Sequence, residues 1–211
     1  MAAMPHSDRP ACTCPLIASY VRAANDLLGM DREKLRPYLP RLIGTNNPQL
    51  MYSRTEAALQ RALGTLVPLA AQWNDAPHLA DRLRQLAHAR EFAAAARLVG
   101  KLHAQAAAGR AAQVFAHIGP SVVHAVSNYE AGAWVSQPVM QASYSESTLH
   151  HIVNITKALA ADLTGCSERR ASLVSGVLSV LGGLLDPGVA TRQTSSRQEN
   201  ANFPYTERVA A

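Results

Sequence analysis

The chain has 211 residues, of which 48% are hydrophobic and 5% aromatic, and Ala is its commonest residue type. A hydrophobic content of this size excludes a wholly disordered protein, while many alanines and few β-branched runs favour helices over sheets. The net charge of +5 comes from residues 31 to 110, where 12 Lys and Arg stand against six Asp and Glu. We therefore predict an all-α fold, an irregular bundle of about seven to nine helices with a basic first half.

Apolar side chains recur at helical spacing between residues 15 and 186, so this stretch is predicted to form a single helical domain. Residues 1 to 14 and 187 to 211 are polar and lack that spacing. Polar segments of this length cannot bury a core of their own. We expect them to form extended N-terminal and C-terminal arms.

The first predicted helix runs from Pro15 to Leu28, with proline at its first position and Gly29 as its stop. Asp31 is suited to cap a short second helix. Pro37 and Pro40 should bend or end that helix, because proline lacks the backbone N–H that a helix interior requires.

The next two predicted elements are punctuated by proline. Asn47 followed by Pro48 is typical of a helix start, and Pro68 should kink the helix that follows before it ends near Trp73, which should close it onto a neighbour. Between residues 77 and 108 the apolar stripe changes phase. Two interpretations remain open, a single straight helix or two helices with a tight break at residues 89 to 91. The second interpretation makes 77 to 118 a region of helical hairpins.

The second half of the domain begins with a helix that we expect to end at Gly119, with a new one starting at Pro120. Residues 131 to 145 are predicted to form a long internal loop. Ser143 and Glu146 have the Ser-x-x-Glu spacing of a capping box, which predicts that the next amphipathic helix begins there.

That amphipathic helix should stop at Gly165, and Ser167 with Glu168 should cap a last helix over residues 169 to 185. The last helix holds the longest strongly apolar run of the chain, 13 residues from 173 to 185, whereas a membrane span needs about 20. We therefore expect no transmembrane span. Small residues recur every fourth position and are expected to seat a neighbouring helix; they are Ser175, Ser179 and Gly183.

The sequence holds none of the common catalytic or cofactor signatures. It lacks the phosphate-binding Gly-x-x-x-x-Gly-Lys-Ser/Thr loop, the dinucleotide-binding Gly-x-Gly-x-x-Gly, the His-Glu-x-x-His of zinc proteases and the Gly-x-Ser-x-Gly nucleophile elbow. No helix carries the repeated Glu-x-x-His of a di-iron bundle. We therefore expect a protein that is not an enzyme and holds no cofactor.

Cysteine and histidine offer weak metal-binding patterns. Cys12 and Cys14 lie near His6, but a structural zinc site needs four ligands, usually as two close pairs. An odd total of three cysteines favours a reducing, intracellular setting over a disulfide framework. His150 and His151 are adjacent and point about 100° apart on a helix, so they cannot share one ion. With His117 and His124, these histidines are the basis of an alternative, a small helical ligand-binding or metal-binding protein or enzyme.

Two groups of residues are candidates for binding a partner. Aromatic residues flank Pro204 in the C-terminal arm, where a stiffened extended segment could anchor to a neighbour. Arginines of both the arm and the basic half could face an acidic partner such as RNA, a cytoskeletal lattice or an anionic membrane. The predicted partner-binding residues are Phe203, Pro204, Tyr205, Arg192, Arg197, Arg82, Arg84, Arg90 and Arg97.

These observations favour a protein that works by binding. The leading interpretation is a non-catalytic accessory or structural subunit of a large intracellular assembly, in the cytoplasm or cytoskeleton or in the mitochondrion. Its partners would be other protein subunits, met through helix faces and through the two arms. A further alternative is a secreted effector that binds a host protein, with the N-terminal arm as its export signal.

Overall fold

The computed structural model describes residues 11–105, 110–163 and 166–188. Within these ranges the protein is all-α and contains no strand, as predicted. Its α-helices number seven when the continuous run α2–η3–α3 is counted as one, and the 3-10 segments η1 and η2 are additional. In chain order the elements are α1 (Pro15–Leu28), η1 (Gly29–Leu42), η2 (Pro48–Leu50), α2 (Met51–Arg61), η3 (Ala62–Leu66), α3 (Val67–Gln72), α4 (Pro77–His88), α5 (Phe92–Gln105), α6 (Arg110–Trp134), α7 (Pro138–Ala161) and α8 (Ser167–Leu185).

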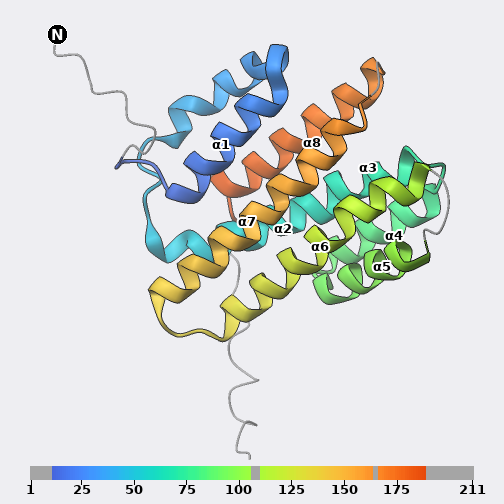
Figure 1. Cartoon of the computed structure of the whole chain (residues 1–211). Helices are drawn as coiled ribbons and strands as arrows, with labels where there is room; N and C mark the ends of the chain where they lie inside the picture. The colour runs from blue at the N-terminus through green and yellow to red at the C-terminus, as the bar shows by residue number, and fades with distance from the viewer. Residues whose placement is uncertain (1–10, 106–109, 164–165, 189–211) are drawn as a thin grey trace, which may run out of the picture.

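The run α2–η3–α3 lies at the centre of the bundle (Figure 1). On one side α8 and α1 pack against each other, and η1 lies outside them as an extra layer. On the other side α4 and α5 form a hairpin next to α3 and α6. The two longest helices, α6 and α7, run antiparallel along much of their length and cover the central run from a third side.

The first helix and its stop agree with the prediction, since α1 ends at Gly29, whose φ of 53° suits a residue without a side chain. The element after it differs. η1 is a 14-residue 3-10 helix that begins at Gly29 and continues past Pro37 and Pro40. In an α-helix the proline rings would clash with the carbonyls four residues earlier, which disfavours α-helical geometry in this segment.

The central run begins as predicted, because the Asn47 side chain accepts a hydrogen bond from the Gln49 amide at 3.0 Å and Pro48 occupies the first position. Near Pro68 the structure shows a π-helix, in which the Val67 amide donates to the Ala62 carbonyl. This change of register occurs just before a proline that has no N–H to offer. The run closes onto α8 beyond Trp73, whose ring lies 5.5 Å from the Arg169 guanidinium.

The structure decides between the two interpretations of residues 77 to 108 in favour of two helices. α4 ends at His88 and α5 begins at Phe92. Between them Arg90 adopts a left-handed conformation, with φ of 59°, and the Glu91 amide donates to the Leu86 carbonyl at 2.9 Å. A tight hairpin therefore joins α4 and α5 at the predicted break.

Three predictions for the second half of the domain are wrong. α6 continues through Gly119 and Pro120 to Trp134, and the expected loop over 131 to 145 shrinks to residues 135–137. Ser143 and Glu146 lie inside α7 and cap nothing. Packing between the two helices explains the difference, because a Cβ on Gly132 would lie only 3.1 Å from that of Tyr144. Gly132 lets α6 and α7 approach closely, and this tertiary contact outweighs its poor helix propensity.

The last helix also departs from the prediction in detail. Its first residue is Ser167, with Cys166 in the capping position, so Ser167 is not the cap. Of the three small residues, Gly183 is buried against α2, but Ser175 and Ser179 lie on the outer side of α8. Gly176 provides the second close approach, toward Leu66. Across the described ranges, none of the helices combines the length and the apolar character that crossing a bilayer demands.

The N-terminal boundary of the body lies slightly earlier than the sequence suggests. Thr13 and Cys14 are buried, and the Cys14 amide donates to the Thr45 hydroxyl at 3.0 Å. The buried Arg54 of α2 donates to the Thr45 carbonyl at 2.6 Å, so the segment after η1 is tied to both α1 and α2. Residues 1–10 and 189–211 of the two predicted arms lie outside the described residues.

Tyr20 joins α1 to α8 in the core, where its hydroxyl donates to the Val177 carbonyl at 3.2 Å. Burial raises the pKa of this hydroxyl far above its usual value of 10.0, and a hydrogen bond with Thr156 opposes part of the rise. Below pH 10 both states of the protein keep the proton. Above it the unfolded chain ionises and the folded one does not, so the folded state loses stability as the pH rises.

We predict that Tyr20→Phe makes the alkaline loss of stability shallower by up to about 1.4 kcal/mol per pH unit. Urea unfolding of the wild type and the variant between about pH 9 and pH 11 measures the difference. Parallel profiles for the two proteins would contradict the buried, protonated Tyr20.

Candidate functional site

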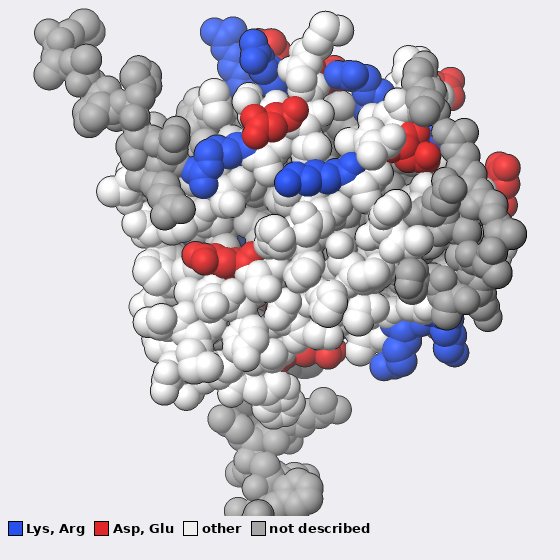
Figure 2. Space-filling model, viewed as in Figure 1, with Lys and Arg blue, Asp and Glu red and all other residues white. Residues whose placement is uncertain are grey.

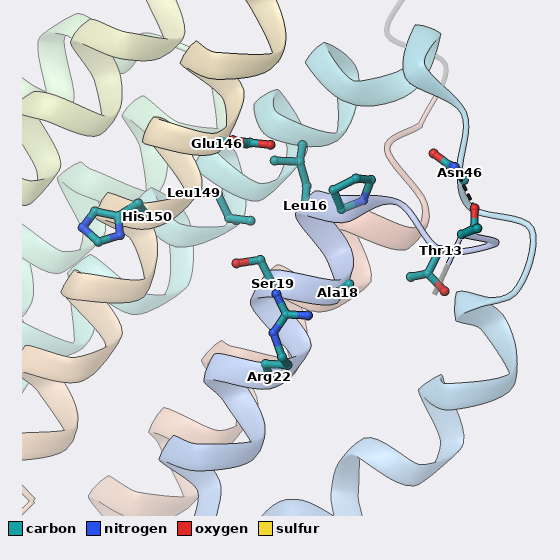
Figure 3. Close-up of a pocket in the computed structure, with 11 residues that line it drawn as sticks. Thr13, Leu16, Ala18, Ser19, Arg22, Asn46, Glu146, Leu149 and His150 are labelled. Atoms are coloured by element: carbon teal, nitrogen blue, oxygen red, sulfur yellow. Dashed lines mark hydrogen bonds between the residues drawn. The ribbon is translucent and has the colours of Figure 1, made fainter. Parts of the chain in front are cut away.

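A cleft of about 560 Å³ lies between α1, α7 and the segment that precedes α2. Figure 3 shows Ser19 and Arg22 of α1 and Glu146 and Leu149 of α7 bordering this hollow from facing sides, while His150 is turned away from α1. The cleft presents one guanidinium and one carboxylate from opposite helices. That arrangement suits a neutral or zwitterionic group better than a strongly charged one.

Three histidines meet where α6 packs on α7. The rings of His124 and His151 stack with centroids 5.2 Å apart, and His150 lies edge-on to His151 at 5.6 Å. Burial lowers the pKa of His151, and the neighbouring His124 and His150 lower it further. The described residues include no group of three or more His, Cys, Asp or Glu side chains that could hold a metal ion.

The sequence did not reveal this histidine cluster, because the register of α6 against α7 was not predicted. The sequence predicts a helix end at Gly119, which would place His117 and His124 on two different helices. In the structure α6 continues through Gly119. Of the cysteines, Cys12 and Cys166 are exposed and Cys14 is buried, and all three are free thiols. His6 lies outside the described residues.

The four body arginines predicted to bind a partner lie on the α4–α5 hairpin but are used differently. Arg90 pairs with Glu56 at 2.9 Å, and Arg84 pairs with Asp81 at 2.7 Å. Arg82 and Arg97 are exposed, and Arg82 donates to the Gln85 side chain at 3.3 Å. Half of this set is therefore neutralised locally. The predicted arm residues lie outside the described residues; they are Arg192, Arg197, Phe203, Pro204 and Tyr205.

A surface that the sequence did not single out lies on η1. Of the 14 residues of η1, all described by the structure, Leu35 alone is buried. Side chains three apart eclipse one another on a 3-10 helix, so one outward row carries Met30, Glu33, Arg36 and Leu39. Met30 is 91% exposed and Leu39 47%. Ile43, one residue beyond η1, is 73% exposed and extends the apolar surface.

A groove of about 720 Å³ runs between α1 and η1 beside this row. Its apolar lining comes from Val21, Leu35 and Leu39. Its polar lining consists of the uncharged Asn25, the acidic Asp26 and Glu33, and the basic Arg22, Arg32 and Arg36. We call the outward row together with Ile43 and this groove the α1–η1 surface. Figure 2 shows Lys and Arg interspersed with a few acidic residues at the upper end of the molecule, where α1 meets η1.

Ion pairs with α8 attach η1 to the body. Arg170 donates to the Asp31 carboxylate at 2.6 Å and to the Leu28 carbonyl at 3.0 Å. Arg41 pairs with Asp186 at the other end of η1. Exposed ion pairs each contribute little stability. η1 is thus held to the body mainly by apolar packing of Leu35, Tyr38 and Leu42 against the core. The ion pairs add to this attachment, and other apolar side chains of η1 are directed to solvent.

No protein-family model, curated protein or solved structure matches this chain. The function is therefore inferred from the surfaces of the molecule, and among these the α1–η1 surface combines the largest exposed apolar side chains of the N-terminal half with a groove.

Proposed function

We propose that the protein is a non-catalytic structural subunit of a larger intracellular assembly and that it binds a neighbouring protein through the α1–η1 surface. The observation that carries the proposal is the exposure of Met30 and Leu39 on η1, in which Leu35 alone is buried, and of Ile43 just beyond it. Large exposed apolar side chains mark sites of interaction when several of them line one face.

The chemistry of the α1–η1 surface is that of a protein interface. Met and Arg are enriched at such interfaces, and a few apolar side chains near the centre provide most of the binding free energy. Met30 and Leu39 would be these central side chains, and Glu33 and Arg36 lie between them in the outward row.

In the proposed assembly, the two arms and the exposed arginines would contact neighbouring molecules as well. The two arms would lie along neighbouring subunits, with Phe203 and Tyr205 as anchors. Arg82 and Arg97, whose charges are not neutralised by a neighbouring carboxylate among the described residues, would face an acidic surface such as RNA or a cytoskeletal lattice. Cytoplasm, cytoskeleton and mitochondrion are the proposed locations.

The double substitution Met30→Asp and Leu39→Asp tests this role. Each change places a carboxylate at an interface centre, where loss of an apolar anchor costs about 2 kcal/mol or more, so binding should weaken by at least about thirtyfold. Size-exclusion chromatography of a cell lysate, followed by immunodetection, measures the fraction in large complexes. The Met30→Asp/Leu39→Asp variant should be absent from the high-mass fractions and elute at a lower mass.

Gln72→Asp is the matched control, because it introduces the same aspartate side chain at an exposed position outside the α1–η1 surface, at the end of α3. Its elution should equal that of the wild type. Circular dichroism of both purified variants verifies that they are folded. An unchanged elution of the folded Met30→Asp/Leu39→Asp protein would refute the α1–η1 surface as the docking site.

A further inference from the structure

The turn between α6 and α7 forms a projecting end of the molecule. α6 ends at Trp134, α7 begins at Pro138, and three residues connect the two antiparallel helices. Figure 1 shows this turn at the opposite end of the described chain from the segment where α1 meets η1. It is therefore a second surface, separate from the α1–η1 surface.

Three large apolar side chains at this end are exposed, next to the uncharged polar Ser136 and Gln137 of the turn. Trp134 is 84% exposed, Val139 82% and Met140 45%. We call these three residues the hairpin tip. They come from both helices, so the tip is a convex cluster on a rigid support, and the rest of α6 and α7 is anchored by packing against the central run.

The hairpin tip lies in the middle of an uncharged stretch. No Asp, Glu, Lys or Arg occurs between residues 131 and 145, and the first charges on either side are Glu130 and Glu146. Figure 2 shows the lower left part of the molecule, over this turn, without charged side chains. At about 1.5 Å per helical residue, Glu130 lies about 6 Å behind Trp134 and Glu146 about 10 Å behind Val139.

We propose that the hairpin tip inserts into the interfacial region of a lipid bilayer and attaches the protein peripherally to a membrane. The uncharged depth of about 6 to 10 Å matches the depth at which interfacial segments lie, between the headgroups and the acyl chains. Trp is enriched at this level because its ring is apolar and its N–H remains near water.

Two features favour a lipid surface over a protein pocket. Three side chains form a smaller contact than the roughly 800 Å² per partner of a stable protein interface, whereas a bilayer accepts a small convex cluster without shape complementarity. The charges that border the tip, Glu130 and Glu146, are both acidic, so they would be repelled by anionic lipid. The inferred surface is therefore zwitterionic, as in phosphatidylcholine.

Tryptophan fluorescence of the full-length chain tests the insertion. The chain has two tryptophans, so a Trp73→Phe variant leaves Trp134 as the sole reporter. Adding phosphatidylcholine vesicles should shift the Trp134 emission to shorter wavelength. Vesicles whose acyl chains carry bromine should also quench this emission. Adding phosphatidylserine to the vesicles should reduce the shift at about 0.15 M salt, where screening beyond about 8 Å leaves the acidic residues beside the tip as the charges nearest the bilayer.

Vesicle flotation provides the second measurement. Val139→Asp should reduce the bound fraction at least about tenfold, since it removes one apolar side chain from the buried surface and adds a charge. Met30→Asp is the matched control on the opposite surface and should bind as the wild type does. Unchanged Trp134 emission with vesicles, or equal losses in both variants, would overturn the proposal. A shift with a purified protein partner in place of vesicles would overturn it as well, since a protein would then cover the tip.

Discussion

Gly183→Val is expected to lower the free energy of unfolding by about 2 to 4 kcal/mol. A Cβ on Gly183 would lie 3.0 Å from the Ala57 carbonyl oxygen and 3.0 Å from the Arg61 Cγ. Because the first of these atoms belongs to the α2 backbone, it cannot move aside without displacing the central run. The branched valine side chain would therefore push α8 away from α2.

The adjacent residue is the matched control for this prediction. No described heavy atom beyond its own helix lies within 4 Å of the position that a Cβ on Gly182 would take, so Gly182→Ala meets open space. Alanine has the higher helix propensity, and this variant should be more stable than the wild type by up to about 1 kcal/mol. Urea unfolding followed by circular dichroism measures both values. Changes of the same sign in the two variants would contradict the close contact of α8 with α2.

Leu66→Ala is expected to cost about 3 kcal/mol, because Leu66 is fully buried in η3 and its removal leaves a cavity between the central run and α8. Leu66 lies over Gly176, where a Cβ would approach its Cδ2 to 2.6 Å. Gly176→Ala alone should therefore be destabilising by a smaller amount, since the end of the leucine side chain can rotate away.

The double variant of these two residues provides a sharper result. Once Leu66 is Ala, the new methyl group at position 176 fills part of the cavity, so the double variant should be about 1 kcal/mol more stable than the sum of the single changes predicts. Leu39→Ala, at a half-exposed position of η1, should change stability little and serves as the control. Strict additivity of Leu66→Ala and Gly176→Ala would mean that the two residues are not in contact.

Local signals in the sequence were sufficient to predict several helix ends in the first half of the fold. The proline that opens α1, the glycine after it and the Asn47 cap each act within one helical turn, and the structure shows all three. The change of phase near residue 90 made the α4–α5 break one of two open interpretations, and the structure shows the break, which a residue with positive φ completes. These features depend on neighbours in sequence, which is why they could be predicted.

The α6–α7 hairpin could not be predicted in this way. Gly119, Pro120 and Gly132 each indicate a helix end when only local propensity is considered. Packing of two long helices supplies the free energy that keeps α6 intact through these residues, and Gly132 is needed for their close approach to each other. The histidine cluster and the hairpin tip were missed for the same reason, since both arise from the pairing of these helices.

The candidate surfaces were predicted only in part. Exposed arginines on the α4–α5 hairpin were expected, but the ion pairs of Arg84 and Arg90 depend on partners that helical periodicity does not specify. The outward row of η1 follows a three-residue repeat, which a search for α-helical spacing passes over. Met30 and Leu39 could have been found by testing that shorter period in the proline-containing segment.

The two proposed surfaces would give the protein a defined orientation. The junction of α1 with η1, where Met30 lies, and the α6–α7 turn are at opposite ends of the described chain, so a partner protein at the junction would leave the hairpin tip free to reach a membrane (Figure 1). The two interactions can therefore be lost independently. Met30→Asp should affect only the first and Val139→Asp only the second.

The native size of the unaltered protein in a gentle cell lysate tests the proposed role most directly. A structural subunit should elute with complexes far larger than its own 22.6 kDa and should remain with them at moderate salt, because apolar contacts provide most of the binding. Elution of the endogenous protein as a free monomer would contradict the account.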